Sequence, residues 1–158
     1  MNNLSEKFLS VLNALQQEEV DYVLIGGFAI VLHGSSRFTE DMDIFIRNTE
    51  KNIERLRKAL NSVFNDDSIS EITSQEIQNY AVIRYGTAED FYIDIIGNIG
   101  EKFSYDDILS EEIIVEGVKI KIATIESLYK LKEKTYRAVD QNDLLFLAEK
   151  LKSKRKNG

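Results

Sequence analysis

Two aspartates two positions apart, Asp41 and Asp43, lie in the stretch Asp-Met-Asp-Ile-Phe-Ile, which is typical of a β-strand. Residues two apart on a strand point to the same face, so both carboxylates project side by side, away from the apolar face of Met42, Ile44 and Ile46. Adjacent carboxylates repel each other, which raises their pKa and favours a nearby cation. An ordinary ion pair on a solvated strand face is the alternative.

A third aspartate, Asp94, is flanked on both sides by apolar residues in the stretch 91–96. A lone charge in such a strand is costly unless it is paired or metal-bound. If this strand lies beside the Asp41–Asp43 strand, three carboxylates converge. The chain has no cysteine and one histidine, so these oxygen ligands suit Mg²⁺ or Mn²⁺, and two such ions are typical of phosphoryl or nucleotidyl transfer. A partnered structural aspartate is the alternative for Asp94.

A Gly26-Gly27 pair follows one predicted strand and opens a predicted helix. Glycines at this position let the backbone approach a ligand closely, and the first turn of the helix offers N–H groups to an anion. A simple tight turn explains the pair equally well, because it matches neither of the common glycine-rich phosphate motifs. The informative feature is the spacing between the glycine pair and the aspartate pair, since 13 residues separate Gly27 from Asp41.

The elements that must position these residues alternate along the chain. Apolar periodicity predicts helices at 4–15, 28–32, 49–63, 73–78, 104–109, 124–136 and 140–151, and strands at 20–25, 41–46, 80–85, 91–96, 113–115 and 118–122. The third and fourth strands are expected to pair antiparallel, and the last two to form a hairpin. This order predicts an α+β fold, in which a mixed sheet is packed with helices largely on one side and followed by a helical C-terminal segment.

Length and composition limit the class of protein. A chain of 158 residues predicts a single domain, 1–158, with a core at about 20–123 and closing helices at about 124–152. Hydrophobic residues at 43% and charged residues at 30% exclude a disordered chain, and the absence of cysteine excludes a disulfide scaffold. The longest apolar run is too short to span a membrane and no signal peptide is recognisable, so a cytoplasmic protein is expected.

The net charge of −7 disfavours extended contacts with nucleic acid. Basic residues nevertheless gather at the C-terminal end, at Lys150, Lys152, Lys154, Arg155 and Lys156. They are consistent with an RNA or acidic-partner contact or, more simply, with a solvated helix end.

The glycine pair at 26–27, His33-Gly34, and the stretch 37–44 with its Asp-x-Asp together resemble the signature of the DNA polymerase β-type nucleotidyltransferase superfamily. Asp94 matches the third acid of that signature. The particular form is similar to small bacterial members: abortive-infection nucleotidyltransferase toxins, minimal nucleotidyltransferases and, more loosely, aminoglycoside and lincosamide nucleotidyltransferases. A weaker C-terminal match comprises Lys132, Arg137, Asp140 and Asp143, so the matching segments run from about residue 20 to 147.

The resemblance implies transfer of a nucleoside monophosphate from a nucleoside triphosphate (NTP) to an acceptor hydroxyl, with release of pyrophosphate. By this resemblance Asp41 and Asp43 hold two Mg²⁺ (or Mn²⁺) ions. Asp94 completes the site of the ion that activates the acceptor, and it lies nearest the acceptor hydroxyl.

On the nucleotide side, the resemblance places Gly26 and Gly27 against the triphosphate and Lys132 near its β- and γ-phosphates. Arg37 is expected to reach a phosphate, or else to pair with an acidic side chain. Ser36 is a further candidate phosphate contact.

The phase of the 124–136 helix also favours Lys132. Leu128 and Leu131 mark the apolar face, and Lys132 lies about 100° beyond Leu131, at the edge of that face. Lys130 and Lys134 are each about 200° from Lys132 and are expected to face solvent.

The acceptor remains open among tRNA, a protein and a small hydroxylated molecule such as an antibiotic. The first two suit a toxin with an antitoxin protein as its partner. A non-catalytic relative that only binds a nucleotide or a partner is a further alternative, although all three acids are present. The last alternative is an unrelated α/β interaction domain whose aspartates are incidental. A membrane partner is not expected.

Overall fold

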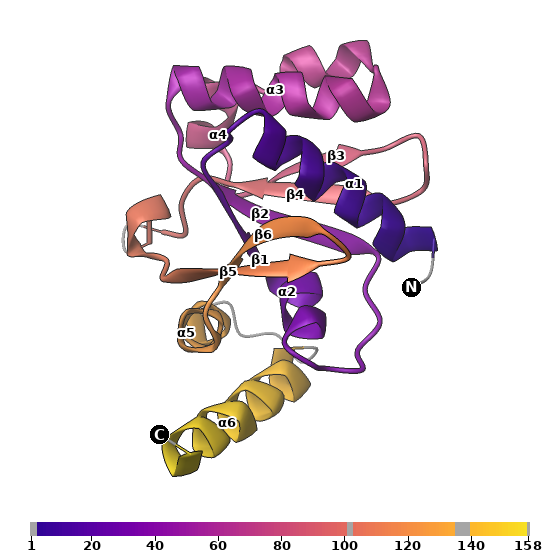
Figure 1. Cartoon of the computed structure of the whole chain (residues 1–158). Coiled ribbons are helices and arrows are strands. Elements are labelled where there is room, and N and C mark those ends of the chain that lie inside the picture. Colours follow the sequence, from indigo (N-terminus) through magenta and orange to yellow (C-terminus); the bar gives the residue numbers. More distant parts are fainter. Residues whose placement is uncertain (1–2, 101–102, 135–139, 158) are drawn as a thin grey trace.

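The structure is a computed structural model that describes residues 3–100, 103–134 and 140–157. Within these residues six strands form one sheet in the order β3-β4-β2-β1-β6-β5 (Figure 1). Their bounds are β1 (Tyr22–Ile25), β2 (Asp41–Ile46), β3 (Ile83–Gly86), β4 (Tyr92–Ile96), β5 (Ser110–Val115) and β6 (Val118–Ala123). β1 is antiparallel to β2 and parallel to β6, β2 is parallel to β4, and β3–β4 and β5–β6 are antiparallel pairs. The mixed sheet and both antiparallel pairs are therefore as predicted.

The helices also follow the predicted order. They are α1 (Asn3–Gln17), α2 (Gly26–Leu32), α3 (Glu50–Phe64), α4 (Ser74–Asn79), α5 (Ile125–Lys134) and α6 (Asp140–Asn157), with 3₁₀ turns at Asp67–Glu71 and Tyr105–Asp107. α3 begins at Glu50, and Thr49 caps it by accepting a hydrogen bond from the Asn52 backbone N–H at 3.2 Å. Across the described residues we find no helix with both the length and the hydropathy of a membrane span.

One face of the sheet packs against α1 and α3. Phe91 precedes β4 and points to the same face as Ile93, and its ring centroid lies 5.1 Å from that of Phe8 in α1 and 5.9 Å from that of Phe64 in α3. Asp94 points to the opposite face, because side chains alternate along the strand. The core therefore lies between this face of the sheet and the two helices.

The opposite face is also apolar over much of its area. Phe45 and Ile96 are buried on the same face as Asp43, and Leu128 and Leu131 of α5 line a cavity together with Ile96 and Asp43. Helices therefore contact both faces of the sheet, which corrects the expectation that they pack largely on one side. The reason is that central strands with apolar residues on both faces need cover on both.

Several element boundaries differ from the sequence-based prediction. The first strand begins at Tyr22, β3 is shifted toward the turn at 86–92, and α2 begins at Gly26 instead of residue 28. The glycine pair thus forms the first turn of α2. The end of the predicted 124–136 helix, and Arg137 with it, lies outside the described residues, and the single-domain organisation stays a prediction.

Candidate functional site

The turn from β1 into α2 brings the backbone against an acidic side chain. Gly26 has φ +72°, in the left-handed region that favours glycine. A Cβ atom built on Gly26 would overlap the carboxylate of Asp43, which is the partner of the preceding residue, Ile25, in the β1–β2 register. The glycine therefore both makes the turn and leaves room for Asp43.

The loop before β2 covers the second glycine. A Cβ on Gly27 would lie 3.1 Å from Thr39 Oγ1 and 3.2 Å from Arg37 Cζ. The Thr39 hydroxyl also donates to the Asp41 carbonyl at 3.0 Å, which ties this loop to the start of β2. The approach to Gly27 is thus occupied by side chains of the protein itself.

All three candidate acids lie on one face of two neighbouring strands. In the parallel β2–β4 register Asp43 is the direct partner of Asp94, and Asp41 is two residues before Asp43. Burial raises the pKa of Asp43 to about 7, and the charge of Asp94, a hydrogen bond with Asp94 and the charge of Asp41 act in the same direction, while Lys132 opposes them. The site therefore concentrates negative charge, which favours binding of a cation.

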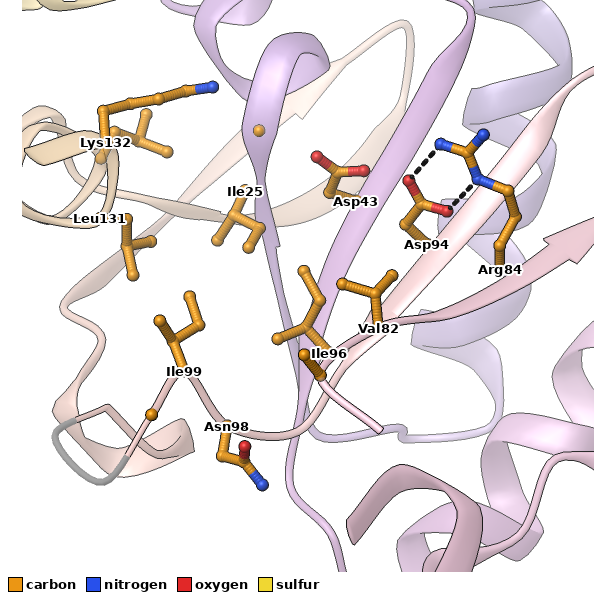
Figure 2. Close-up of a pocket in the computed structure, with 14 residues that line it drawn as sticks. Ile25, Asp43, Val82, Arg84, Asp94, Ile96, Asn98, Ile99, Leu131 and Lys132 are labelled. Atoms are coloured by element: carbon orange, nitrogen blue, oxygen red, sulfur yellow. Dashed lines mark hydrogen bonds and ion pairs between the residues drawn. The ribbon is translucent and has the colours of Figure 1, made fainter. Parts of the chain in front are cut away.

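Sequence reasoning missed Arg84, which binds two of these acids. Its Nε donates to Asp94 Oδ1 at 2.8 Å, and its Nη2 donates to Asp94 Oδ2 at 3.0 Å (Figure 2). The same Nη2 donates to Asp41 Oδ2 at 3.2 Å. The β3–β4 register places Arg84 directly opposite Asp94. The predicted antiparallel pairing of 80–85 with 91–96 brings Arg84 near Asp94, but only the register decides that the two side chains lie on the same face.

Two of the cations expected at the triphosphate meet on one buried carboxylate instead. Asp143 of α6 is 3% exposed and forms ion pairs with Arg37 Nη1 and with Lys132 Nζ, the latter at 3.3 Å. Arg37 thus adopts the alternative of pairing with an acid. Ser36 is exposed on the same loop and is absent from the residues lining the cavity described below.

The lysines of α5 divide as the helix phase predicts. Lys132 has a side chain only 12% exposed and lines the cavity with Leu128 and Leu131, whereas Lys130 is exposed to solvent. The side chain of Lys134 lies outside the described residues. The side chain of Asp140 also lies outside the described residues, so its predicted place in the C-terminal motif stays a prediction.

Some of these residues line a cavity of about 570 Å³ (Figure 2). Its polar end carries Gly26, Asp43, Asp94, Arg84 and Lys132, and its apolar lining includes Ile25, Val82, Ile96, Ile99, Leu128 and Leu131, with Asn98 beside them. A cavity of this size holds a small molecule or part of a nucleotide. Charged groups at one end and apolar groups along the walls suit a ligand with a phosphate or hydroxyl at one end and an apolar or planar body.

A family comparison decides what class of protein carries this site. The model of the family described as nucleotidyl transferase of unknown function (DUF2204) matches residues 4–157. The chain belongs to this family. It is a nucleotidyltransferase, so the reaction class that the sequence resemblance implies is confirmed. No curated protein matches the chain.

Solved structures show the same fold for this nucleotidyltransferase. The lincosamide antibiotic adenylyltransferase LnuA, bound to lincomycin, matches with a TM-score of 0.58 and 17% identity, over 93% of this chain and 98% of LnuA. TM1012 from Thermotoga maritima matches with a TM-score of 0.53 and 17% identity, over 96% and 90% of the two chains. ANT(2'')-Ia, in complex with adenylyl-2''-tobramycin, matches with a TM-score of 0.52 and 12% identity, over 96% and 92%.

The donor atoms of this candidate site fit a divalent metal ion in kind. Asp41, Asp43 and Asp94 offer carboxylate oxygens, the ligands that Mg²⁺ and Mn²⁺ prefer. In the described part of the chain, however, no three His, Cys, Asp or Glu side chains are gathered closely enough to hold an ion as they stand. Asp43 faces Asp94, while Asp41 and Asp94 are bridged by the Arg84 guanidinium.

Proposed function

We propose that this nucleotidyltransferase transfers a nucleoside monophosphate from an NTP to a hydroxyl of a small acceptor molecule, with Mg²⁺ or Mn²⁺ held by three aspartates. The observation that carries the proposal is the placement of Asp41, Asp43 and Asp94 on one face of β2 and β4, beside the Gly26 turn. Family membership supports the reaction class, and the carboxylates support the metal dependence.

The three aspartates have different roles in the proposed reaction. Asp41 and Asp43 would hold both ions, and Asp94 would share the ion on the acceptor side. The bound ions would neutralise the carboxylates and the charge that develops on the phosphate. The acceptor oxygen forms a bond to the α-phosphorus, the bond from the α-phosphorus to the bridging oxygen breaks, pyrophosphate leaves, and Asp94 accepts the hydroxyl proton.

Cationic and backbone groups would bind the triphosphate. Lys132 is the strongest candidate, because its side chain lines the cavity at the polar end, opposite Asp43. Gly26 and Gly27 would leave the β1–α2 turn open to the phosphates. Arg37 would contribute from the Asp143 ion pair and Ser36 from the same loop, although neither residue lines the cavity.

A small acceptor is favoured over a large one. The apolar walls at Ile96, Ile99, Leu128 and Leu131 suit a compact organic molecule, and the acidic chain disfavours a polynucleotide. Two proteins of the same fold were solved with lincomycin and with adenylyl-2''-tobramycin, so hydroxylated antibiotics are the first acceptors to try. A cytoplasmic toxin that modifies tRNA or a protein, controlled by an antitoxin, is the alternative that the same experiment distinguishes.

The test is a transfer assay with each of the four α-³²P-labelled NTPs and Mg²⁺ or Mn²⁺. The acceptors are a lincosamide, an aminoglycoside, total tRNA and a protein extract. Label in the antibiotic, together with released pyrophosphate, supports the proposal, and label in tRNA or protein supports the toxin alternative. Asp43→Asn should lower the transfer rate by orders of magnitude. Asp67→Asn should leave the rate unchanged, because it makes the same change of charge at an exposed residue outside the cavity lining. Equal rates in the two variants would refute the assignment of the site.

A further inference from the structure

The guanidinium of Arg84 lies where the acceptor-side carboxylate would bind a metal ion. Its Nε and Nη2 engage both oxygens of Asp94, at 2.8 and 3.0 Å, and Nη2 also reaches Asp41 at 3.2 Å. This fork uses the geometry in which arginine binds carboxylates most strongly. Figure 2 shows the fork closed over Asp94 at the end of the cavity that also holds Asp43.

A metal ion at the same place is incompatible with this arrangement. An ion held by Asp41 and Asp94 would compete with Arg84 for their carboxylate oxygens, and it would bring two like charges within a few ångströms of each other. The described residues contain no gathered group of three acidic ligands, and in this arrangement the Arg84 guanidinium bridges Asp41 and Asp94.

The surroundings of Arg84 make its departure easy. It lies on β3, an edge strand of the sheet, and its side chain is 52% exposed. The guanidinium also stacks over the ring of Tyr92, 4.7 Å from the centroid, and that ring is itself exposed. When the arginine leaves Asp94 it can therefore remain over Tyr92 and in water, at little cost in free energy.

We infer that Arg84 is a displaceable counter-ion: it neutralises Asp94 and Asp41 when no metal is bound, and a divalent cation must displace it to complete the site. The inference rests on the proposed function, since it assigns metal binding to the same aspartates. Arg84 thereby sets the metal affinity of the resting protein. Its positive charge also offsets the repulsion between the carboxylates before metal and nucleotide bind.

The experiment measures Mn²⁺ binding by the full-length chain without nucleotide, from the electron paramagnetic resonance signal of free Mn²⁺. Arg84→Gln should bind Mn²⁺ roughly ten-fold more tightly than the wild type, because it removes one charge beside the ion. Arg84→Lys keeps the charge but cannot form the fork, so its affinity should lie between the two. Arg55→Gln, the same loss of charge at a partly exposed residue of α3 outside the cavity lining, should stay within about two-fold of the wild type.

Each outcome decides the inference. In the Arg84→Gln background, Asp43→Asn should remove the gained affinity, and a gain that survives this change lies at another site and refutes the inference. The inference also fails if Mn²⁺ binding depends on Asp43 but Arg84→Gln binds Mn²⁺ no more tightly than the wild type. Arg84 then stays in place beside the metal, and the proposed function stands. If Mn²⁺ binding never depends on Asp43, the metal site of the proposed function fails and the inference falls with it.

Discussion

Lys132 Nζ of α5 lies 3.3 Å from Oδ2 of Asp143, a carboxylate of α6 that also holds Arg37. The Asp143 side chain is 4% exposed, so one buried anion joins two helices and the loop before β2. Substituting Asp143→Asn leaves two cations without their shared partner. We expect the free energy of unfolding to fall by roughly 2–4 kcal/mol, measured by urea denaturation. Asp67→Asn, at an exposed residue, should change it by less than about 0.5 kcal/mol, and equal losses would exclude a stabilising role for Asp143.

Lys132 should contribute directly to triphosphate affinity. Lys132→Ala removes the cavity-lining ammonium and should weaken binding of a non-hydrolysable NTP analogue by roughly 1.5–3 kcal/mol in isothermal titration calorimetry. Lys130→Ala removes an exposed ammonium two residues away on the same helix and should cost little. If Lys130 proves to be the sensitive position, or if neither matters, the phosphate clamp lies elsewhere, and Arg37 becomes the next candidate.

The Gly26 turn should tolerate no side chain. Gly26→Ala adds a Cβ at φ +72° and places it on the Asp43 carboxylate, so it should displace Asp43, abolish Mn²⁺ binding and destabilise the fold by roughly 2–4 kcal/mol. Gly117→Ala is a matched control, because Gly117 has φ +81° in the β5–β6 turn but no atom within 4 Å of the added Cβ. It should cost only the backbone strain, about 1 kcal/mol, and leave Mn²⁺ binding unchanged. Equal effects of the two variants would show that backbone conformation alone matters at Gly26.

The metal-free protein should lose stability as pH rises from about 4 to about 7. The pKa of Asp43 is raised from 3.8 to about 7 by burial and by its acidic neighbours, so in this range the folded state binds a proton that the unfolded state has released. The stabilisation is complete below pH 4 and is lost as pH rises through 7, by roughly a few kcal/mol. Urea denaturation in chelator at several pH values measures it. Asp43→Asn should flatten this dependence, and an unchanged slope in that variant would place its origin in another group.

The common face of Asp41 and Asp43 was predictable, because strand geometry alone decides it. The alternation of apolar residues at 42, 44 and 46 marks the strand, and a period of two then puts both carboxylates on one side. The glycine pair was predictable for a similar local reason, since a turn between a strand and a helix needs positive φ or a close approach, and Gly26 has both. The phase of α5 likewise separates Lys132 from Lys130.

Only the tertiary structure decides which charges meet across the sheet and between the helices. Arg84 is 10 residues from Asp94 and 43 from Asp41, and it reaches both because the β3–β4 register places it opposite Asp94; a slip of one residue would turn it to the other face. Arg37 and Asp143 are 106 residues apart, and nothing local in the sequence indicates that α6 returns to the loop before β2. The raised pKa of Asp43 depends on burial and on its partner strand, so the sequence determined which acids the site has, and the packing of strands and helices decided which cations neutralise them.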